Sequence, residues 1–339
     1  MRSFGSDNNS GVHPLILKAI EEANQNHTIA YGDDPWTEKA KSIIKENFGE
    51  KAEPFFVFNG TGANTIALRA ATKPFNSIIT AETGHIAVDE CGAPVFLTGA
   101  SLKEIPTKDG KLTPALIAPL LTHRGFEHHS QPKVAYISQC TELGTVYTLD
   151  EIRTLADFLH QEDIYLHVDG ARLANAAISL QASFKEMITD CGVDILSFGG
   201  TKNGMMMGET VISFRPELTE NMKYIRKQSA QLFSKMRYIS AQFVAYFENE
   251  LWLENAGHAN KMAQKLREGI NAVMPVDFTQ KTEANILLLK LPETLIDGLL
   301  ERHFFYIWNE QNHEIRLVTS WDTTDEDIAG FLNDLKKMV

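Results

Sequence analysis

The chain has 339 residues, enough for one large domain and a smaller one. Hydrophobic residues make up 43% and charged residues 22%, the proportions of an ordinary globular protein, and the net charge of −12 argues against a nucleic-acid or anionic-membrane partner. The three cysteines are widely spaced without a CxxC pair, which predicts no disulfide framework, no zinc site and a reducing cytoplasm. The start of the chain does not resemble a signal peptide, and no apolar run approaches the ~20 residues of a membrane span.

Apolar runs alternate with helical patterns over the first part of the chain. We predict strands at 54–60, 77–82, 95–99, 133–139, 164–170, 194–200 and 210–214. We predict helices at 62–72, near 86–91, at 113–122 and at 149–163. Strands that alternate with helices of this length form βαβ units, and several of the runs are apolar on both faces, so we expect a mostly parallel sheet.

A different pattern follows the predicted sheet. Residues 216–273 are helical in pattern, and after 275 come two apolar strand runs, a helix between them and a C-terminal helix. We therefore predict a large α/β domain with an N-terminal arm over 1–245 and a small α+β domain over 246–339.

The residues directly after each strand are the first candidates for a site, because ligands bind beyond the carboxyl ends of the strands in open α/β sheets. NGTGAN (59–64) follows the first strand and opens a helix, whose free N–H groups and dipole favour a phosphate. Its spacing is not GxGxxG and it lacks the Walker lysine, so a plain glycine-rich turn is the alternative. His85 follows the second strand, either as a helix cap or as a flat ring stacked on a flat cofactor.

Charged residues follow two later strands. Asp169 ends the run IYLHVDG, where a buried carboxylate is costly unless it is paired; a structural hydrogen bond is the alternative to a functional role. Arg172, three residues later, suits a carboxylate clamp. Lys202 lies in the glycine-rich loop SFGGTKNG. A partly desolvated lysine has a lowered pKa, and its neutral amine can form a Schiff base with a carbonyl group.

A phosphate cradle, a stacking ring, an aspartate and a lysine in this order fit one ligand, pyridoxal 5′-phosphate (PLP). Asp169 would keep the pyridine nitrogen protonated, so that the ring can accept electrons from the substrate Cα. A nucleotide-binding Rossmann enzyme is disfavoured, because it leaves Lys202 without a role. A metal-dependent aldolase is disfavoured as well, because the chain has no HExxH motif or His/Cys cluster, and we expect no metal.

Six segments resemble, in order and spacing, the bacterial low-specificity L-threonine aldolases, which are fold-type-I PLP-dependent enzymes of the β-eliminating lyase/threonine aldolase group. The segments are SDNNSGVHP (6–14), YGDDP (31–35), GTGAN (60–64), HVDGARLANA (167–176), SFGGTKNG (197–204) and IRLVTSWDT (315–323). The resemblance implies a transferase-like fold with a mostly parallel seven-stranded sheet and a small C-terminal α+β domain. It also implies cleavage of L-threonine or L-allo-threonine to glycine and acetaldehyde, and the reverse aldol addition of glycine to aldehydes.

The resemblance implies roles for the matched residues around the cofactor. Lys202 binds the cofactor aldehyde, Asp169 pairs with the pyridinium nitrogen, and His85 stacks on the ring near the substrate hydroxyl. The other residues expected to contact the cofactor are Gly60, Thr61 and Asn64 at the phosphate, with Arg172 and Arg237.

The resemblance also implies how the substrate is held and how subunits assemble. Ser6, Arg172 and Arg316 hold the substrate carboxylate. Tyr31 crosses an interface into a neighbouring subunit's site, and Arg237 is expected to reach a partner's phosphate, in a homodimer or homotetramer with shared active sites.

One loop departs from the family pattern. Many members carry a histidine after a threonine in the loop that follows the strand 133–139, whereas this chain reads SQCTELG and has Glu142 there. The acceptor of the β-hydroxyl proton is therefore open between His85, a water molecule and Glu142, with the pKa of histidine better suited to neutral pH. Phenylserine cleavage, β-elimination, transamination or racemisation on the same fold, or a PLP-fold protein without turnover, are the alternatives.

Overall fold

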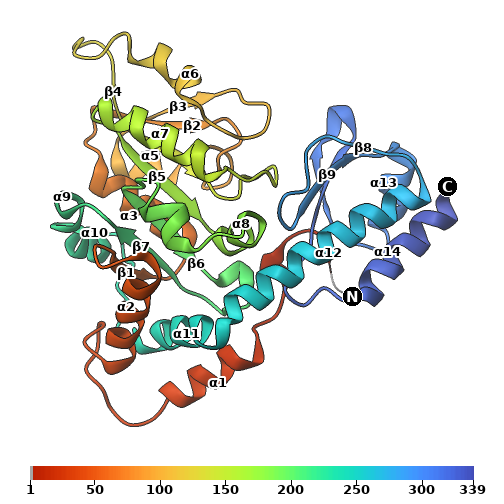
Figure 1. The fold of residues 1–339 in the computed structure, drawn as a ribbon, viewed down its shortest axis with the longest axis horizontal. Coiled ribbons are helices and arrows are strands. Elements are labelled where there is room, and N and C mark those ends of the chain that lie inside the picture. The colour runs from red at the N-terminus through yellow and green to blue at the C-terminus, as the bar shows by residue number, and fades with distance from the viewer. Residues whose placement is uncertain (1–2) are drawn as a thin grey trace.

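A seven-stranded sheet organises the larger part of the chain, of which the computed structural model describes residues 3–339 (Figure 1). Its strands are β1 (Glu53–Val57), β2 (Asn76–Ala81), β3 (Ser101–Ile105), β4 (Gln131–Ser138), β5 (Tyr165–Gly170), β6 (Ile195–Gly199) and β7 (Glu209–Ser213). The order is β1-β7-β6-β5-β4-β2-β3, and only the pairings of β7 with β1 and β6 are antiparallel. The predicted mostly parallel seven-stranded sheet is confirmed.

Helices cover this sheet and connect its strands. They are α1 (Pro14–Ala23), α2 (Pro35–Phe48), α3 (Gly60–Ala71), α4 (His85–Val88), α5 (Ala93–Thr98), α6 (Pro114–Ile117), α7 (Leu149–Gln161), α8 (Leu173–Leu180), α9 (Pro216–Thr219), α10 (Met222–Gln228) and α11 (Arg237–Phe247). The start of α7 agrees with the prediction because Thr148 and Glu151 form a capping box, each side chain accepting from the other's backbone N–H.

The prediction of a strand at 95–99 is wrong, because these residues lie in and just after helix α5. The run PVFLT is apolar and β-branched, which favours a strand locally, but Gly92 and Gly99 flank it in the left-handed conformation and close a short helix. Phe96 is 85% exposed, so this run does not enter the sheet interior. The edge strand is β3 instead, which begins at Ser101, two residues after Gly99.

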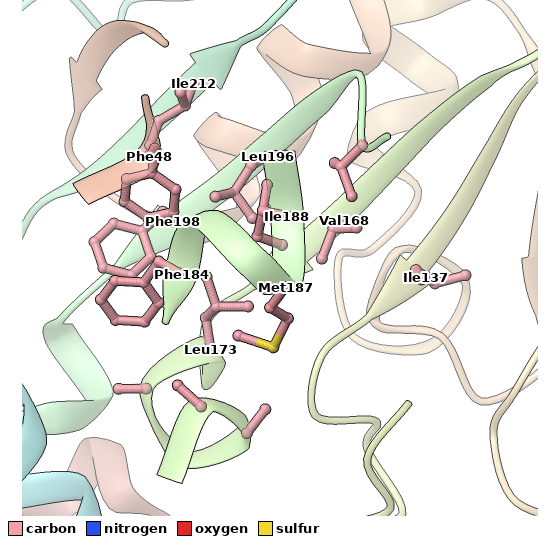
Figure 2. Close-up of a cluster of buried hydrophobic side chains, with 14 of the residues drawn as sticks. Phe48, Ile137, Val168, Leu173, Phe184, Met187, Ile188, Leu196, Phe198 and Ile212 are labelled. Carbon is pink, nitrogen blue, oxygen red and sulfur yellow. The ribbon is translucent and has the colours of Figure 1, made fainter. Parts of the chain in front are cut away.

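A cluster of aromatic side chains fills the core between the sheet and its covering helices (Figure 2). The rings of Phe48 and Phe184 are stacked with centroids 5.2 Å apart, and Phe198 lies 5.3 Å from each of them. These residues come from α2, from the segment after α8 and from β6. The cluster therefore anchors the strand that leads directly into the loop containing Lys202.

A four-stranded antiparallel sheet forms the second, smaller unit, in the order β10-β11-β9-β8. Its elements are β8 (Asp277–Phe278), β9 (Ile286–Lys290), α13 (Glu293–Leu300), β10 (Tyr306–Asn309), β11 (Glu314–Val318) and α14 (Asp325–Met338). The long helix α12 (Leu251–Val273) runs from the larger unit to the smaller one (Figure 1). The small α+β unit is thus observed, while the boundary at 245/246 stays a prediction. None of the helices in the described part of the chain has the length and apolarity that a membrane span requires.

The N-terminal arm joins the smaller unit before the chain enters the larger one, and both termini lie at this end of the molecule (Figure 1). The N–H of Phe4 donates to the carbonyl of Phe304, and its own carbonyl accepts from the N–H of Val318. Its ring is buried against Phe331, with centroids 5.4 Å apart. Further along the arm, the N–H of His13 donates to the carbonyl of Gly204, beside the Lys202 loop.

We expect Phe198→Ala to lower the free energy of unfolding by about 3–5 kcal/mol, because it removes a fully buried ring and leaves a cavity between its aromatic neighbours. Phe198→Leu keeps most of the apolar volume and should lose less. Urea titration followed by circular dichroism measures both. A loss below about 1 kcal/mol for the alanine variant would contradict a tightly packed core at this position.

Candidate active site

A cavity of about 430 Å³ lies where the carboxyl ends of the parallel strands meet the N-terminal arm and the smaller unit. The register of the sheet explains why distant residues meet here: Ser138 at the end of β4 pairs with Asp169 near the end of β5, which pairs with Ser197 in the middle of β6. Seven of the predicted site residues line the cavity, namely Ser6, His85, Glu142, Asp169, Arg172, Lys202 and Arg316. Tyr306, Ile307 and Trp308 of β10 form an additional wall from the smaller unit.

Lys202 lies in a single 3-10 turn (Thr201–Asn203) after β6, and neighbouring helices hold this turn in place. The side-chain amide of Asn203 donates to the hydroxyl of Tyr246 (2.7 Å), and Asn255 of α12 donates to the carbonyl of Asn203 (2.9 Å). Gly204 ends the turn at φ +100°, and a Cβ there would lie 2.7 Å from the Asn255 amide. Burial, together with the charge of Arg172, lowers the pKa of the Lys202 amine.

Asp169 is a buried carboxylate with several hydrogen-bond donors. Its Oδ2 accepts from the Asn64 amide (2.8 Å) and from the Tyr136 hydroxyl (2.7 Å), while Oδ1 accepts from the N–H of Ala171 (2.9 Å). Burial acts to raise its pKa, but the charges of His85 and Lys202 and these hydrogen bonds hold the pKa below its ordinary value. The carboxylate is therefore ionised at neutral pH, and Oδ1 retains a lone pair for a further donor.

His85 begins α4 between two carboxylates. Its Nδ1 lies 2.8 Å from Oε1 of the buried Glu90, and its backbone N–H donates to Oε1 of Glu142 (2.9 Å). Burial acts to lower the pKa of His85, but the hydrogen bond with Glu90 and the charge of Asp169 raise it overall. Glu142 also accepts from the Ser138 hydroxyl (2.6 Å), and burial raises the pKa of its carboxyl group.

His85, Glu90 and Asp169 place potential metal-ligand atoms within 4.8 Å of one another. The amide of Asn64 donates to both Glu90 (2.7 Å) and Asp169, so these acceptors already belong to one hydrogen-bond network. We interpret these contacts as structural: Asn64 and Glu90 hold the Asp169 carboxylate and the His85 ring in position.

The two predicted arginines have different surroundings. Arg172 is bound by the carboxylate of Asp7, through Nε to Oδ2 (2.6 Å) and Nη2 to Oδ1 (2.8 Å). Arg316 of β11 faces no such carboxylate: its Nε is buried without a hydrogen-bond partner among the described residues, and its guanidinium lies 5.3 Å from the ring centroid of Trp308. Burial and the charge of Arg172 lower the pKa of Arg316 to about 10, so it remains cationic at neutral pH.

Five predicted residues lie outside the cavity lining. Gly60 and Thr61 form the first turn of α3, where the side chain of Asn59 accepts from the N–H of Gly62 (2.8 Å). The side-chain amide of Asn64 donates to Asp169 and Glu90, and its expected contact with the phosphate stays a prediction.

Tyr31 and Arg237 also lie apart from this chain's own cavity. Tyr31 is 50% exposed at φ +63°, and the amine of Lys227 lies 5.2 Å from its ring centroid. Arg237 begins α11 and donates to the carbonyls of Gln25 and Asn26. Their roles at a neighbouring subunit stay predictions.

Sequence reasoning missed four residues that support the site: Asp7, Glu90, Tyr136 and Trp308. Asp7 stands inside SDNNSGVHP, one of the segments singled out above, but its partner is 165 residues away. Tyr136 lies in an apolar strand, where an aromatic residue is expected to belong to the hydrophobic core. Only the fold shows that its hydroxyl faces Asp169.

The residues present fit PLP. Asp169 offers an ionised carboxylate for a protonated ring nitrogen, Lys202 offers an amine with a lowered pKa, and the N-terminus of α3 offers backbone donors for a phosphate. Gly62, in the same turn, has no Cβ, and this lets the side chain of Gln231 pack against the helix start.

Comparisons with known proteins identify the family of this chain. A family model described as beta-eliminating lyase matches residues 3–292. A low specificity L-threonine aldolase of Pseudomonas aeruginosa is 40% identical over 99% of this chain and 97% of that relative, and one of a Pseudomonas species is 38% identical over 100% and 98%.

Solved structures show the same fold. A Leishmania major threonine aldolase superposes with a TM-score of 0.93 at 32% identity, covering 100% of this chain and 99% of that one. A Thermus thermophilus aspartate aminotransferase shares the fold alone, with a TM-score of 0.72 at 15% identity over 97% and 89% of the two chains. The sheet, the cavity and the sequence matches together show that this chain is a PLP-dependent lyase and belongs to the beta-eliminating lyase family.

Proposed function

We propose that this protein is a low-specificity L-threonine aldolase, which cleaves L-threonine or L-allo-threonine to glycine and acetaldehyde and catalyses the reverse addition of glycine to aldehydes. The observation that carries the proposal is the convergence of Lys202, Asp169 and His85 on one cavity that also contains Arg316. The full-length similarity to threonine aldolases supports it.

PLP, when bound, supplies an electron-withdrawing ring that weakens the Cα–Cβ bond of the amino acid. Lys202 would hold its aldehyde, Asp169 its ring nitrogen, and Gly60 and Thr61 its phosphate at the start of α3. Arg316, whose Nε has no hydrogen-bond partner in the part of the chain that the structure describes, binds the substrate carboxylate, with Ser6 and Arg172 beside it. A fixed carboxylate limits rotation of the substrate and so selects which bond at Cα is weakened.

His85 is the group we assign to the β-hydroxyl proton. Its Nδ1 is engaged by Glu90, which leaves Nε2 to accept the proton, and the ion-pairing carboxylate raises the pKa of the ring. The carboxylate of Glu142 accepts a hydrogen bond from the backbone N–H of His85 and so holds the start of helix α4 in place.

The proposed assembly is a homodimer or homotetramer in the cytoplasm. Tyr31 is half-exposed and lies outside its own chain's cavity, as expected of a residue that completes a neighbour's site. The cysteines Cys91, Cys140 and Cys191 are all free, which fits a reducing compartment.

Lys202→Ala should abolish acetaldehyde release from L-threonine and L-allo-threonine, because no other amine replaces the Schiff-base partner of the cofactor. The assay couples acetaldehyde to its reduction by an added dehydrogenase, with wild type and variant at equal concentration. The ratio of the two wild-type rates gives the preference at Cβ. A wild-type protein that binds PLP but releases no aldehyde would refute the proposal and direct the search to phenylserine, serine and alanine.

The pH dependence of kcat/KM should show an acid limb whose midpoint lies above the ordinary pKa of histidine. The reason is that His85 must be neutral to accept a proton and its pKa is raised, so activity is present above that pKa and falls as pH drops through it. His85→Asn should lose this limb and about 100-fold or more in kcat. Glu142→Gln should keep the limb; its disappearance in that variant would instead identify Glu142 as the acceptor.

A further inference from the structure

Asp7 is an acid that the proposed chemistry does not use, yet it is completely buried beside the cavity. Its two oxygens bind Nε and Nη2 of Arg172 at 2.6 and 2.8 Å, and Oδ2 also accepts from the side-chain amide of Asn285 at 3.0 Å. A paired, bidentate geometry of this kind fixes the plane of the guanidinium as well as its position. These bonds to Asp7 use Nε and Nη2 of the guanidinium and do not use Nη1.

The three partners come from three separate parts of the chain. Asp7 lies in a 3-10 turn of the N-terminal arm (Asp7–Asn9), Arg172 precedes α8 of the larger unit, and Asn285 precedes β9 of the smaller unit. Ser6, adjacent to Asp7, lines the cavity, and its side chain caps the same turn by accepting from the N–H of Asn8. The position of Arg172 is thus tied to the arm and to the smaller unit that contains Arg316.

Two guanidinium groups line this one cavity, and their charges repel each other. The charge of Arg172 disfavours the cationic form of Arg316, and the charge of Asp7 favours it. Asp7 therefore compensates the charge of the two buried arginines, although its own side chain does not line the cavity. Arg316 is left as the guanidinium with no anionic partner among the residues described.

We propose that Asp7 is a positioning residue for the substrate carboxylate: it fixes Arg172 so that Nη1 of Arg172 and the guanidinium of Arg316 receive that carboxylate together. This inference rests on the proposed function, since it assigns the carboxylate subsite of the same cavity. Arg172 acts here through an orientation that the arm imposes. Without the charge of Asp7, the guanidinium of Arg172 can turn away from that of Arg316. Binding of the substrate carboxylate then weakens, although no group that contacts the substrate has been removed.

Glycine is the probe that tests the proposal, because it has the carboxylate but no side chain. Its dissociation constant is measured on the holoenzyme from the change in cofactor absorbance, and kcat and KM for L-threonine are measured alongside. Asp7→Asn, which keeps the shape and removes the charge, should raise the glycine dissociation constant and the threonine KM by about 10-fold or more, with kcat changed far less. Arg172→Lys, which cannot form the bidentate pair, should act similarly. Asn285→Ala removes the other side-chain donor to Asp7 without touching a cavity residue, should weaken glycine binding in the same direction, and keeps the test valid if Asp7→Asn does not fold.

The double variant decides whether the two residues act as one unit. Asp7→Asn combined with Arg172→Lys should raise the glycine dissociation constant no more than the larger single effect. Asp194→Asn is the matched control: Asp194 is equally buried and pairs with Arg215, but it precedes β6 at the opposite end of the sheet. It should lower the melting temperature and leave glycine binding unchanged.

Unchanged or tighter glycine binding in Asp7→Asn, or effects that multiply in the double variant, would overturn the positioning role. If the wild-type protein binds glycine but releases no aldehyde from threonine, the proposed function is refuted and the role of Asp7 is not. The glycine data would then still decide the role of Asp7.

Discussion

Burial penalises every charge that the cavity brings together, and the geometry of the site follows from how that penalty is offset. Asp169 remains ionised because Asn64, Tyr136 and a backbone N–H donate to it. Glu142 is held by a serine hydroxyl and a backbone N–H, and Arg172 by the carboxylate of Asp7. The partners come from several elements, including α3, β4, α4 and the N-terminal arm, so the same contacts that stabilise the charges also assemble the fold around them.

The N-terminal arm connects the two units at the site. Phe4 is part of the core of the smaller unit, Asp7 binds Arg172 of the larger one, and His13 donates to the backbone beside the Lys202 loop. A short stretch of chain thus contacts both sides of the cavity and the lysine loop. Displacement of the arm would leave the buried guanidinium of Arg172 without its counter-charge, and this cost favours the position of the arm seen here.

Much of the sheet and several site residues could be predicted from local patterns. Parallel strands end at the same edge of a sheet, so the rule of reading the residue after each strand led directly to His85, Asp169 and Lys202. The same local reasoning failed at residues 95–99, where apolar β-branched residues indicated a strand and two left-handed glycines close a helix instead. For Asn64, the helix start was located correctly, but the direction of the side chain follows from contacts with β4 and β5.

The sequence by itself determined the alternation of strands and helices, because this depends on periodicity along the chain. It also determined that a phosphate loop, His85, Asp169 and Lys202 follow strands in this order, which is the pattern that predicted PLP. Tertiary structure alone decided which groups compensate one another. It paired Asp7 with Arg172 and left Arg316 without an anionic partner among the described residues. It also placed the Tyr136 hydroxyl on Asp169. These pairings join residues far apart in the chain, and their energies depend on distance and burial, which no local pattern encodes.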